Sequence, residues 1–109
     1  MSVIQKAEDV EGKLVDHGKG ITFRTLICGP TFRMRHITLA KGGNTPQHTH
    51  AWEHEVYVLE GCGELYTPSG YKPIMAGDCI MVPPHEEHQF RNAGDDVFKF
   101  ICLVPNSAP

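Results

Sequence analysis

Residues 42–61 read GGNTPQHTHAWEHEVYVLEG, and this stretch says more about the fold than any other part of the chain. His48 and His50 are two residues apart, so extended backbone places both imidazoles on the same face. Four extended residues span about 13 Å, so His50 and His54 can approach one metal ion only if the chain bends between them. The stretch therefore predicts a bend between two strands, with three histidines turned to the same side.

A second stretch, residues 77–92, reads GDCIMVPPHEEHQFRN and brings a fourth histidine. The pair Pro83-Pro84 cannot occupy a central strand position, because proline has no N–H to donate to the sheet. His88 therefore opens a new strand after the two prolines. Together the two stretches predict that His48, His50, His54 and His88 converge on one divalent transition-metal ion.

The rest of the chain is divided by glycine and proline into short apolar runs, with a turn signal every eight to twelve residues. No segment carries a convincing helical period, and many short strands at even spacing favour an all-β barrel or sandwich. The predicted strands are residues 21–28, 32–39, 54–60, 78–82, 88–92 and 97–104.

Length and charge limit the remaining possibilities. The 109 residues fit one domain over 1–109, with residues 105–109 as a loose tail. Ten basic and thirteen acidic side chains are mixed along the chain, giving a net charge of −3 and no basic stripe for nucleic acid. Neither a membrane-spanning apolar run nor the apolar core of a signal peptide is seen, so a cytoplasmic protein with no membrane partner is expected. The four cysteines form no C-x-x-C pair and are expected to be buried thiols.

The two histidine stretches resemble the two sequence motifs of the cupin family. Residues 42–61 are similar to G-x5-H-x-H-x3,4-E-x6-G, and residues 77–92 to G-x5-P-x-G-x2-H-x3-N. The resemblance implies a single cupin domain, a double-stranded β-helix or jelly-roll barrel. Small bacterial cupins with a four-histidine site, some of which carry manganese, look closest.

Two positions depart from these motifs. The usual glutamate position holds His54, and Glu55 is displaced by one residue. A shift of one residue turns a strand side chain to the opposite face, so Glu55 is expected to point away from the metal. His85 stands where the second motif has glycine, and it either lines the mouth of the site or is simply solvated.

The predicted ligands restrict the metal without choosing it. Imidazole ligands disfavour magnesium and calcium and suit manganese, iron, cobalt, nickel, copper or zinc. The family resemblance favours manganese or iron. An octahedral ion would keep two open positions, whereas a closed structural zinc site would use the four ligands tetrahedrally.

Alternation along the strands suggests which side chains line a substrate pocket. The candidates are Arg35, Val56, Phe90, Phe100, Cys102 and Val104. Arg35 either reaches a carboxylate or enolate substrate or forms a salt bridge at the rim. Cys102 is expected beside the metal without being a ligand, with a lowered pKa. No role is assigned to His36.

Two classes of function follow from these features. The first is a small metalloenzyme acting on a small organic molecule, with oxygenase-type chemistry favoured by two adjacent open metal positions. The alternative is a non-catalytic module, a sensor or store, that binds metal and a small molecule. Sugar isomerisation, known for relatives of this fold, has no distinct support. A homodimer is expected, because cupins commonly pair through sheet edges and the segments 3–4 and 21–28 are apolar.

Overall fold

The computed structural model describes residues 1–108, and its secondary structure is almost entirely β-strand, which confirms the predicted all-β class. A short 3₁₀ helix, η1 (Ala7–Asp9), precedes the strands. The strands of this described part are β1 (Lys13–Leu14), β2 (Lys19–Cys28), β3 (Phe32–Asn44), β4 (His54–Glu60), β5 (Cys62–Thr67), β6 (Gly70–Met75), β7 (Cys79–Val82), β8 (Gln89–Asn92) and β9 (Phe98–Pro105).

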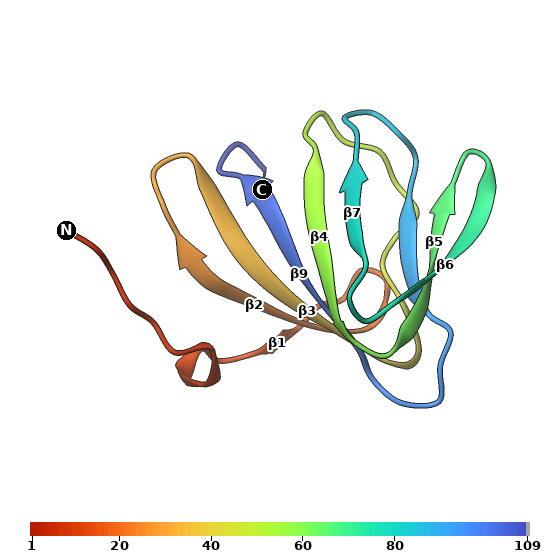
Figure 1. Cartoon of the computed structure of the whole chain (residues 1–109), viewed down its shortest axis with the longest axis horizontal. Helices are drawn as coiled ribbons and strands as arrows, with labels where there is room; N and C mark the ends of the chain where they lie inside the picture. Colours follow the sequence, from red (N-terminus) through yellow and green to blue (C-terminus); the bar gives the residue numbers. More distant parts are fainter. Residues whose placement is uncertain (109) are drawn as a thin grey trace.

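All the strands belong to one antiparallel sheet that curls into a cup (Figure 1). The hydrogen-bonded order is β6-β5-β8-β3-β9-β4-β7, with β2 also paired to β3 and β1 to β2. The long strand β3 connects the two sides of the cup. Its first part pairs with β9 and its last residue, Asn44, pairs with Arg91 of β8. The two histidine-bearing stretches, far apart in sequence, are thereby brought to the same concave side.

The concave face of the sheet holds the core. Along β9, Phe98, Phe100, Cys102 and Val104 are buried, whereas the residues between them are partly exposed, as the alternation predicts. On the neighbouring strand β4, Val56 and Val58 are buried in the same way. Removing these apolar side chains from water is the main driving force that curls the sheet.

Two motif glycines occupy backbone conformations that other residues adopt only with strain. Gly61, between β4 and β5, has φ +89°, and a Cβ added there would lie 2.5 Å from the carbonyl oxygen of Val97. Gly77, before β7, has φ +96°. Both turns therefore need the conformational freedom of glycine.

One hairpin of the sheet was not predicted. Strands β5 and β6 fill the spacer between the two motifs and pair over their whole length. Proline at position 73 argues against a central strand, but β6 is an edge strand in the sheet order, where proline is tolerated. Gly63, Leu65 and Thr67 are buried in alternation along β5.

The C-terminal residues also differ from the loose tail predicted for 105–109. Pro105 ends β9, and Ala108 is buried. The Asn106 side-chain amide donates to the carbonyl oxygen of Gly29 over 2.6 Å, and the Arg33 guanidinium donates to the carbonyl oxygen of Ala108 over 2.5 Å. These contacts hold the segment against the β2–β3 turn. Pro109 lies outside the described residues.

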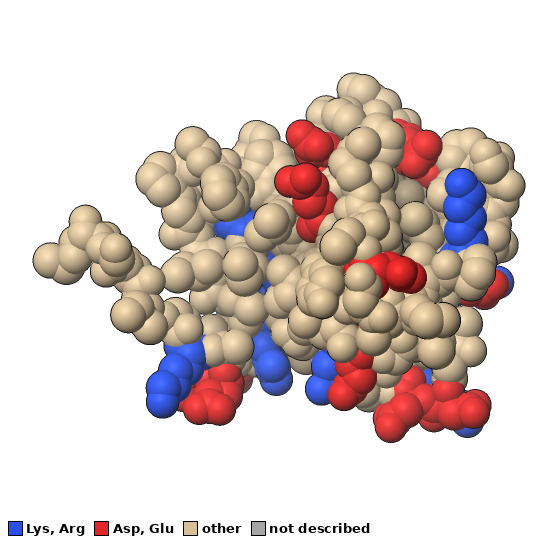
Figure 2. Space-filling model, in the orientation of Figure 1, with Lys and Arg blue, Asp and Glu red and all other residues tan. Residues whose placement is uncertain are grey.

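The surface carries both charges in small groups. Figure 2 shows acidic and basic side chains interspersed on one face, without a continuous basic area. Within residues 1–108, no helix has the length and apolar character needed to cross a membrane.

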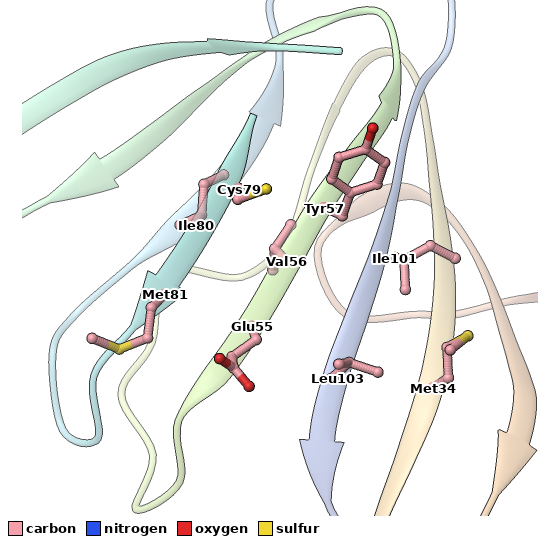
Figure 3. A pocket seen from close by; sticks show the side chains of 9 residues that line it. All are labelled: Met34, Glu55, Val56, Tyr57, Cys79, Ile80, Met81, Ile101 and Leu103. Atoms are coloured by element: carbon pink, nitrogen blue, oxygen red, sulfur yellow. The ribbon is translucent and has the colours of Figure 1, made fainter. Parts of the chain in front are cut away.

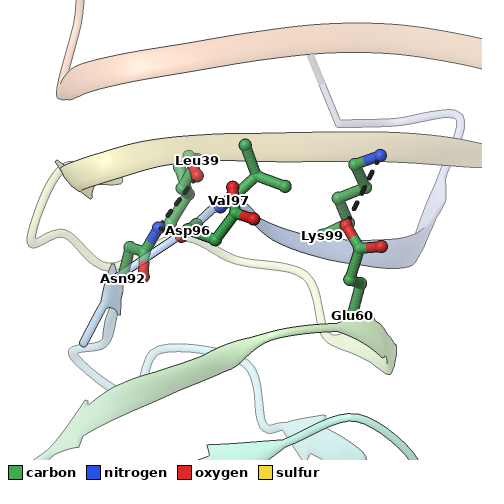
Figure 4. Close-up of polar contacts among 6 residues, drawn as sticks. All are labelled: Leu39, Glu60, Asn92, Asp96, Val97 and Lys99. Carbon is green, nitrogen blue, oxygen red and sulfur yellow. Dashed lines mark hydrogen bonds and ion pairs between the residues drawn. The ribbon is translucent and has the colours of Figure 1, made fainter. Parts of the chain in front are cut away.

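Asn92, the last residue of β8, ties three segments together from a buried position. Its side-chain nitrogen lies 3.1 Å from the carbonyl oxygens of Leu39 and Ala40 and 2.7 Å from that of Asp96 (Figure 4). Its side-chain oxygen accepts from the backbone N–H of Gly94 over 2.9 Å. The asparagine of the second motif is therefore a structural residue that fixes the turn into β9.

Replacing Asn92 with alanine is predicted to lower the free energy of unfolding by about 2–3 kcal/mol, because buried backbone groups lose their partners. The Lys99–Glu60 pair of the same region provides the control, since it is half exposed and its charged atoms are 3.5 Å apart. Lys99→Ala should cost less than about 1 kcal/mol. Urea unfolding followed by circular dichroism measures both, and equal losses would contradict this role for Asn92.

Candidate metal centre

Three histidines gather at the rim of the concave face. His48, His50 and His88 each offer a ring nitrogen, and these atoms lie within 4.8 Å of one another. His48 is exposed, His50 is half-buried and His88 is buried. Their ring centroids are 4.8–5.0 Å apart, in edge-to-face orientations that point the nitrogens into a shared space. Such a group can hold a divalent metal ion.

Backbone hydrogen bonds fix the segments that carry these histidines. His48 and His88 form an isolated antiparallel bridge, with N–H to carbonyl distances of 3.1 and 3.0 Å. The N–H of His85 donates to the carbonyl oxygen of His50 over 2.8 Å. His85 is exposed and has φ +67°, so it adopts the left-handed conformation that the glycine of the motif would supply.

The tautomers of two rings are set by carbonyl groups. The Nδ1 atoms of His50 and His88 lie 3.0 and 2.8 Å from the carbonyl oxygens of Trp52 and Glu86. A carbonyl can only accept, so each Nδ1 carries the proton and each neutral ring presents the lone pair of Nε2. This is how metal-binding histidines are commonly held, and the residues present therefore fit a metal ion.

His54 faces the same space as these three histidines but lies outside the cluster they form. Its Nε2 is 2.5 Å from Nε2 of His50, and its ring centroid is 5.2 Å from that of His88. Its Nδ1 is 2.9 Å from Sγ of Cys102. Glu55 lies on the outer face of the sheet, beside Tyr57, as the one-residue shift predicts (Figure 3).

Desolvation keeps three of the imidazoles here neutral, those of His48, His50 and His54. Desolvation, with the neighbouring rings adding to it, lowers the pKa of His48 to about 4 and that of His54 to about 3. The pKa of His50 is also lowered by desolvation, although its hydrogen bond to the Trp52 carbonyl opposes the shift. At neutral pH these imidazoles are unprotonated, which is the state a metal ligand requires.

A cavity of about 110 Å³ opens beside the cluster, bordered by His48, His54 and His88. Four of the six predicted pocket residues line it, namely Arg35, Phe90, Phe100 and Cys102. Val56 and Val104 are not among its lining residues, although they belong to the same hydrophobic core. Residues that the sequence reading missed also contribute, namely Val15, His17, Ile21, Phe23, Ile37, Thr45 and Pro46. The alternation of β2 was the signal that could have identified Phe23.

Trp52 packs against the cluster, whereas His36 does not. Trp52 stacks on His50 with a centroid distance of 4.2 Å and an interplanar angle of 4°, which supports the bend between the ligand segments. His36 pairs with Arg24 across β2 and β3, one residue out of phase with the cavity-facing Arg35. His36 therefore lies on the opposite face of the sheet and takes no part in the cluster.

The cysteines differ from expectation. Cys28, Cys62 and Cys79 are exposed, although all were expected to be buried. They stand at strand positions that face away from the core. Cys102 is buried on the concave face, and without a metal ion burial raises the pKa of its thiol to about 12.

Thiol-reactive dye should therefore modify three cysteines per chain quickly, leaving Cys102 unmodified until the protein unfolds. Peptide mass spectrometry identifies the modified positions. The Cys102→Ser variant serves as the control, and it should still show three fast thiols. Fast modification of Cys102 in the folded chain would contradict its placement in the core.

Comparison with known proteins agrees with this architecture. The Cupin domain family matches residues 35–104. The polyketide cyclase RemF from Streptomyces resistomycificus superimposes with a TM-score of 0.89 and 30% identity, over 96% of this chain and 80% of that one.

Two curated relatives are more distant. The 1-methylthio-D-xylulose 5-phosphate methylsulfurylase of Rhodospirillum rubrum is 28% identical over 88 residues, which are 79% of this chain and 56% of the relative. The polyketide synthase CurC of Streptomyces cyaneus is 29% identical over 97 residues, 84% of this chain and 63% of the relative. The chain thus spans less than two thirds of the length of these relatives. The family match, covering most of the chain and both histidine stretches, shows that the protein belongs to the cupin family.

Proposed function

We propose that this cupin is a metalloenzyme that binds one divalent transition-metal ion and acts on a small organic molecule. The convergence of imidazole nitrogens beside a cavity carries the proposal. His48, His50 and His88 supply three ligands, and His54 is proposed as the fourth because its Nε2 faces that of His50. Manganese or iron is the proposed ion, with nickel, cobalt, copper and zinc compatible with the same donors.

A catalytic role is favoured over storage or sensing by the space beside the ligands. A closed structural site would have its surroundings filled by side chains, whereas here a cavity of about 110 Å³ borders His48, His54 and His88. Phe90 and Phe100 give that space apolar walls. A small molecule can therefore lie next to the metal position. The non-catalytic alternative predicts binding there without turnover.

The bound ion would supply Lewis-acid polarisation of a substrate oxygen, and with iron or manganese also redox chemistry. Oxygenase-type chemistry is the first candidate, because an octahedral ion held by four protein ligands would keep two positions for oxygen and substrate. A second candidate is redox-neutral cyclisation, favoured by the similarity to the polyketide cyclase RemF. In both, the four neutral imidazoles add no negative charge, so the polarising power of the ion is undiminished.

The protein is also proposed to form a homodimer in solution. The outer face of the sheet exposes a groove of about 430 Å³ between Met34, Tyr57, Met81, Ile101 and Leu103 (Figure 3). The side chains of Tyr57 and Met81 are 49% and 56% exposed. Together they give this face a continuous exposed apolar area. A second copy of the chain would cover this face.

The metal site is tested by measuring the metal content of protein purified without added metal, followed by titration with Mn(II). Wild type should bind one ion per chain. His88→Ala and His50→Ala should weaken binding by more than about 100-fold, because losing even a residue that only supports a ligand costs 10- to 100-fold. His85→Ala removes a nearby imidazole outside the cluster and should bind as wild type does. Equal binding by all four proteins would contradict the site.

The same preparations distinguish the reaction classes. Metal-loaded protein is incubated with small carboxylates, phenols and 1,3-dicarbonyl compounds, with and without oxygen. Oxygen uptake that requires both metal and compound supports the oxygenase, and product formed under anaerobic conditions supports the redox-neutral reaction. Saturable binding without turnover of any compound supports the non-catalytic alternative.

Light scattering tests the homodimer, which should have twice the 12.1 kDa mass of the chain. Leu103→Arg places a charge in the apolar groove and should shift the protein to monomer. Met75→Arg, on the exposed edge strand β6, is the control and should leave the dimer intact. A monomeric wild type at micromolar concentration would overturn this proposal.

A further inference from the structure

Trp52 connects the histidine cluster to the core of the cup. It lies in the bend between β3 and β4, two positions after His50 and two positions before His54. Its half-buried side chain packs against the hydrophobic core. The same indole ring stacks on the imidazole of His50, with the ring centroids 4.2 Å apart and the ring planes 4° from parallel. A side chain anchored on the core therefore covers one face of a proposed metal ligand.

This one residue holds the His50 ring in two directions. The backbone carbonyl oxygen of Trp52 lies 3.0 Å from Nδ1 of His50, which fixes the direction of the imidazole within its own plane. The parallel indole opposes tilting of the imidazole out of that plane. With Nδ1 held in this way, Nε2 of His50 faces Nε2 of His54, on the side where the ion is proposed to bind.

No hydrogen bond accounts for the position of the indole. Its Nε1 is buried and has no hydrogen-bond partner among the described residues. A buried N–H without an acceptor is unfavourable, so this donor does not stabilise the arrangement. Packing on the core and stacking on His50 are the contacts that hold the ring. An aromatic ring without an N–H should therefore be able to replace the indole at this position.

We infer that Trp52 is a positioning residue for the metal, and that its stacking contact with His50 strengthens metal binding. A divalent ion draws electron density from the imidazoles that bind it. The electron-rich face of an aromatic ring attracts positive charge, and the indole of tryptophan does so best. Stacking therefore favours the metal-bound form of His50 over its free form, and an interaction that favours one of two states shifts the equilibrium toward that state. The inference concerns the metal site of the proposed function and rests on it.

The first test replaces the ring and measures Mn(II) binding by calorimetry. Trp52→Leu keeps an apolar side chain but removes the aromatic face. It should weaken Mn(II) binding about 10- to 100-fold, the range for residues that support a ligand. Trp52→Phe retains a ring and should bind Mn(II) within about threefold of wild type.

Urea unfolding of the metal-free variants separates this role from a merely structural one. Both substitutions remove apolar side-chain volume, so both should lower stability. A structural role alone would make Mn(II) affinity fall in step with the loss of stability, and Trp52→Phe would then lose affinity as Trp52→Leu does. Equal weakening by the two variants, or wild-type affinity in Trp52→Leu, would overturn the inference.

The second test uses the fluorescence of Trp52 itself, because the chain has no other tryptophan. Mn(II) should quench this emission with the same midpoint as the calorimetric titration, because the indole contacts a ligand ring. The control combines Trp52→Phe with Tyr71→Trp, which moves the indole to an exposed position on the edge strand β6. The emission of this control should not respond to Mn(II).

The outcomes separate the inference from the function on which it rests. Mn(II) binding that leaves the wild-type emission unchanged would overturn the role of Trp52 alone. Failure of the wild type to bind Mn(II) in the calorimeter would count against the proposed metalloenzyme, and the inference would fall with it.

Discussion

The antiparallel bridge between His48 and His88 is the constraint on which the rest of the site depends. Two backbone hydrogen bonds, of 3.1 and 3.0 Å, join the segment after β3 to the segment before β8. Each segment has a histidine at this bridge, so the hydrogen bonds that close this part of the sheet also bring the two imidazoles together. A third bond, from the N–H of His85 to the carbonyl oxygen of His50, adds the bend between β3 and β4 to the same unit. The site is thus a consequence of how the cup is closed.

The electrostatic character of the site depends on the absence of acidic side chains from the described lining residues. Glu55, whose position in the motif differs by one residue from the usual glutamate, faces the outer groove and leaves the inner face to His54. The lining residues described here are aromatic, aliphatic or imidazole, apart from Arg35 and a few small polar or thiol groups. A metal bound among them would retain its full charge. This single-residue shift therefore links a detail of β-strand register to the strength of the proposed Lewis acid.

Much of this arrangement could be predicted from the sequence, because alternation and motif spacing are local properties. The inner face of β9 follows from the alternation of Phe98, Phe100 and Cys102 with partly exposed neighbours, and the turn before β7 follows from Gly77. The distances among the histidines could not be predicted, since they depend on pairings between strands distant in sequence. The β5–β6 hairpin was missed because Pro73 is acceptable only at the edge that β6 occupies. The prediction of a loose tail was also wrong for residues 105–108. Arg33 and Asn106 hold this segment through contacts between residues more than seventy positions apart in the sequence.

A crystal structure of the Mn(II)-loaded protein, with the ion located by anomalous scattering, tests the central claim most directly. The account predicts one ion per chain with Nε2 of His48, His50, His54 and His88 all within about 2.3 Å of it, and no carboxylate from the chain among the ligands. It also predicts that the Nδ1 atoms of His50 and His88 keep their contacts with the carbonyl oxygens of Trp52 and Glu86. An ion bound elsewhere, or bound through Glu55 with His54 turned outward, would contradict the account.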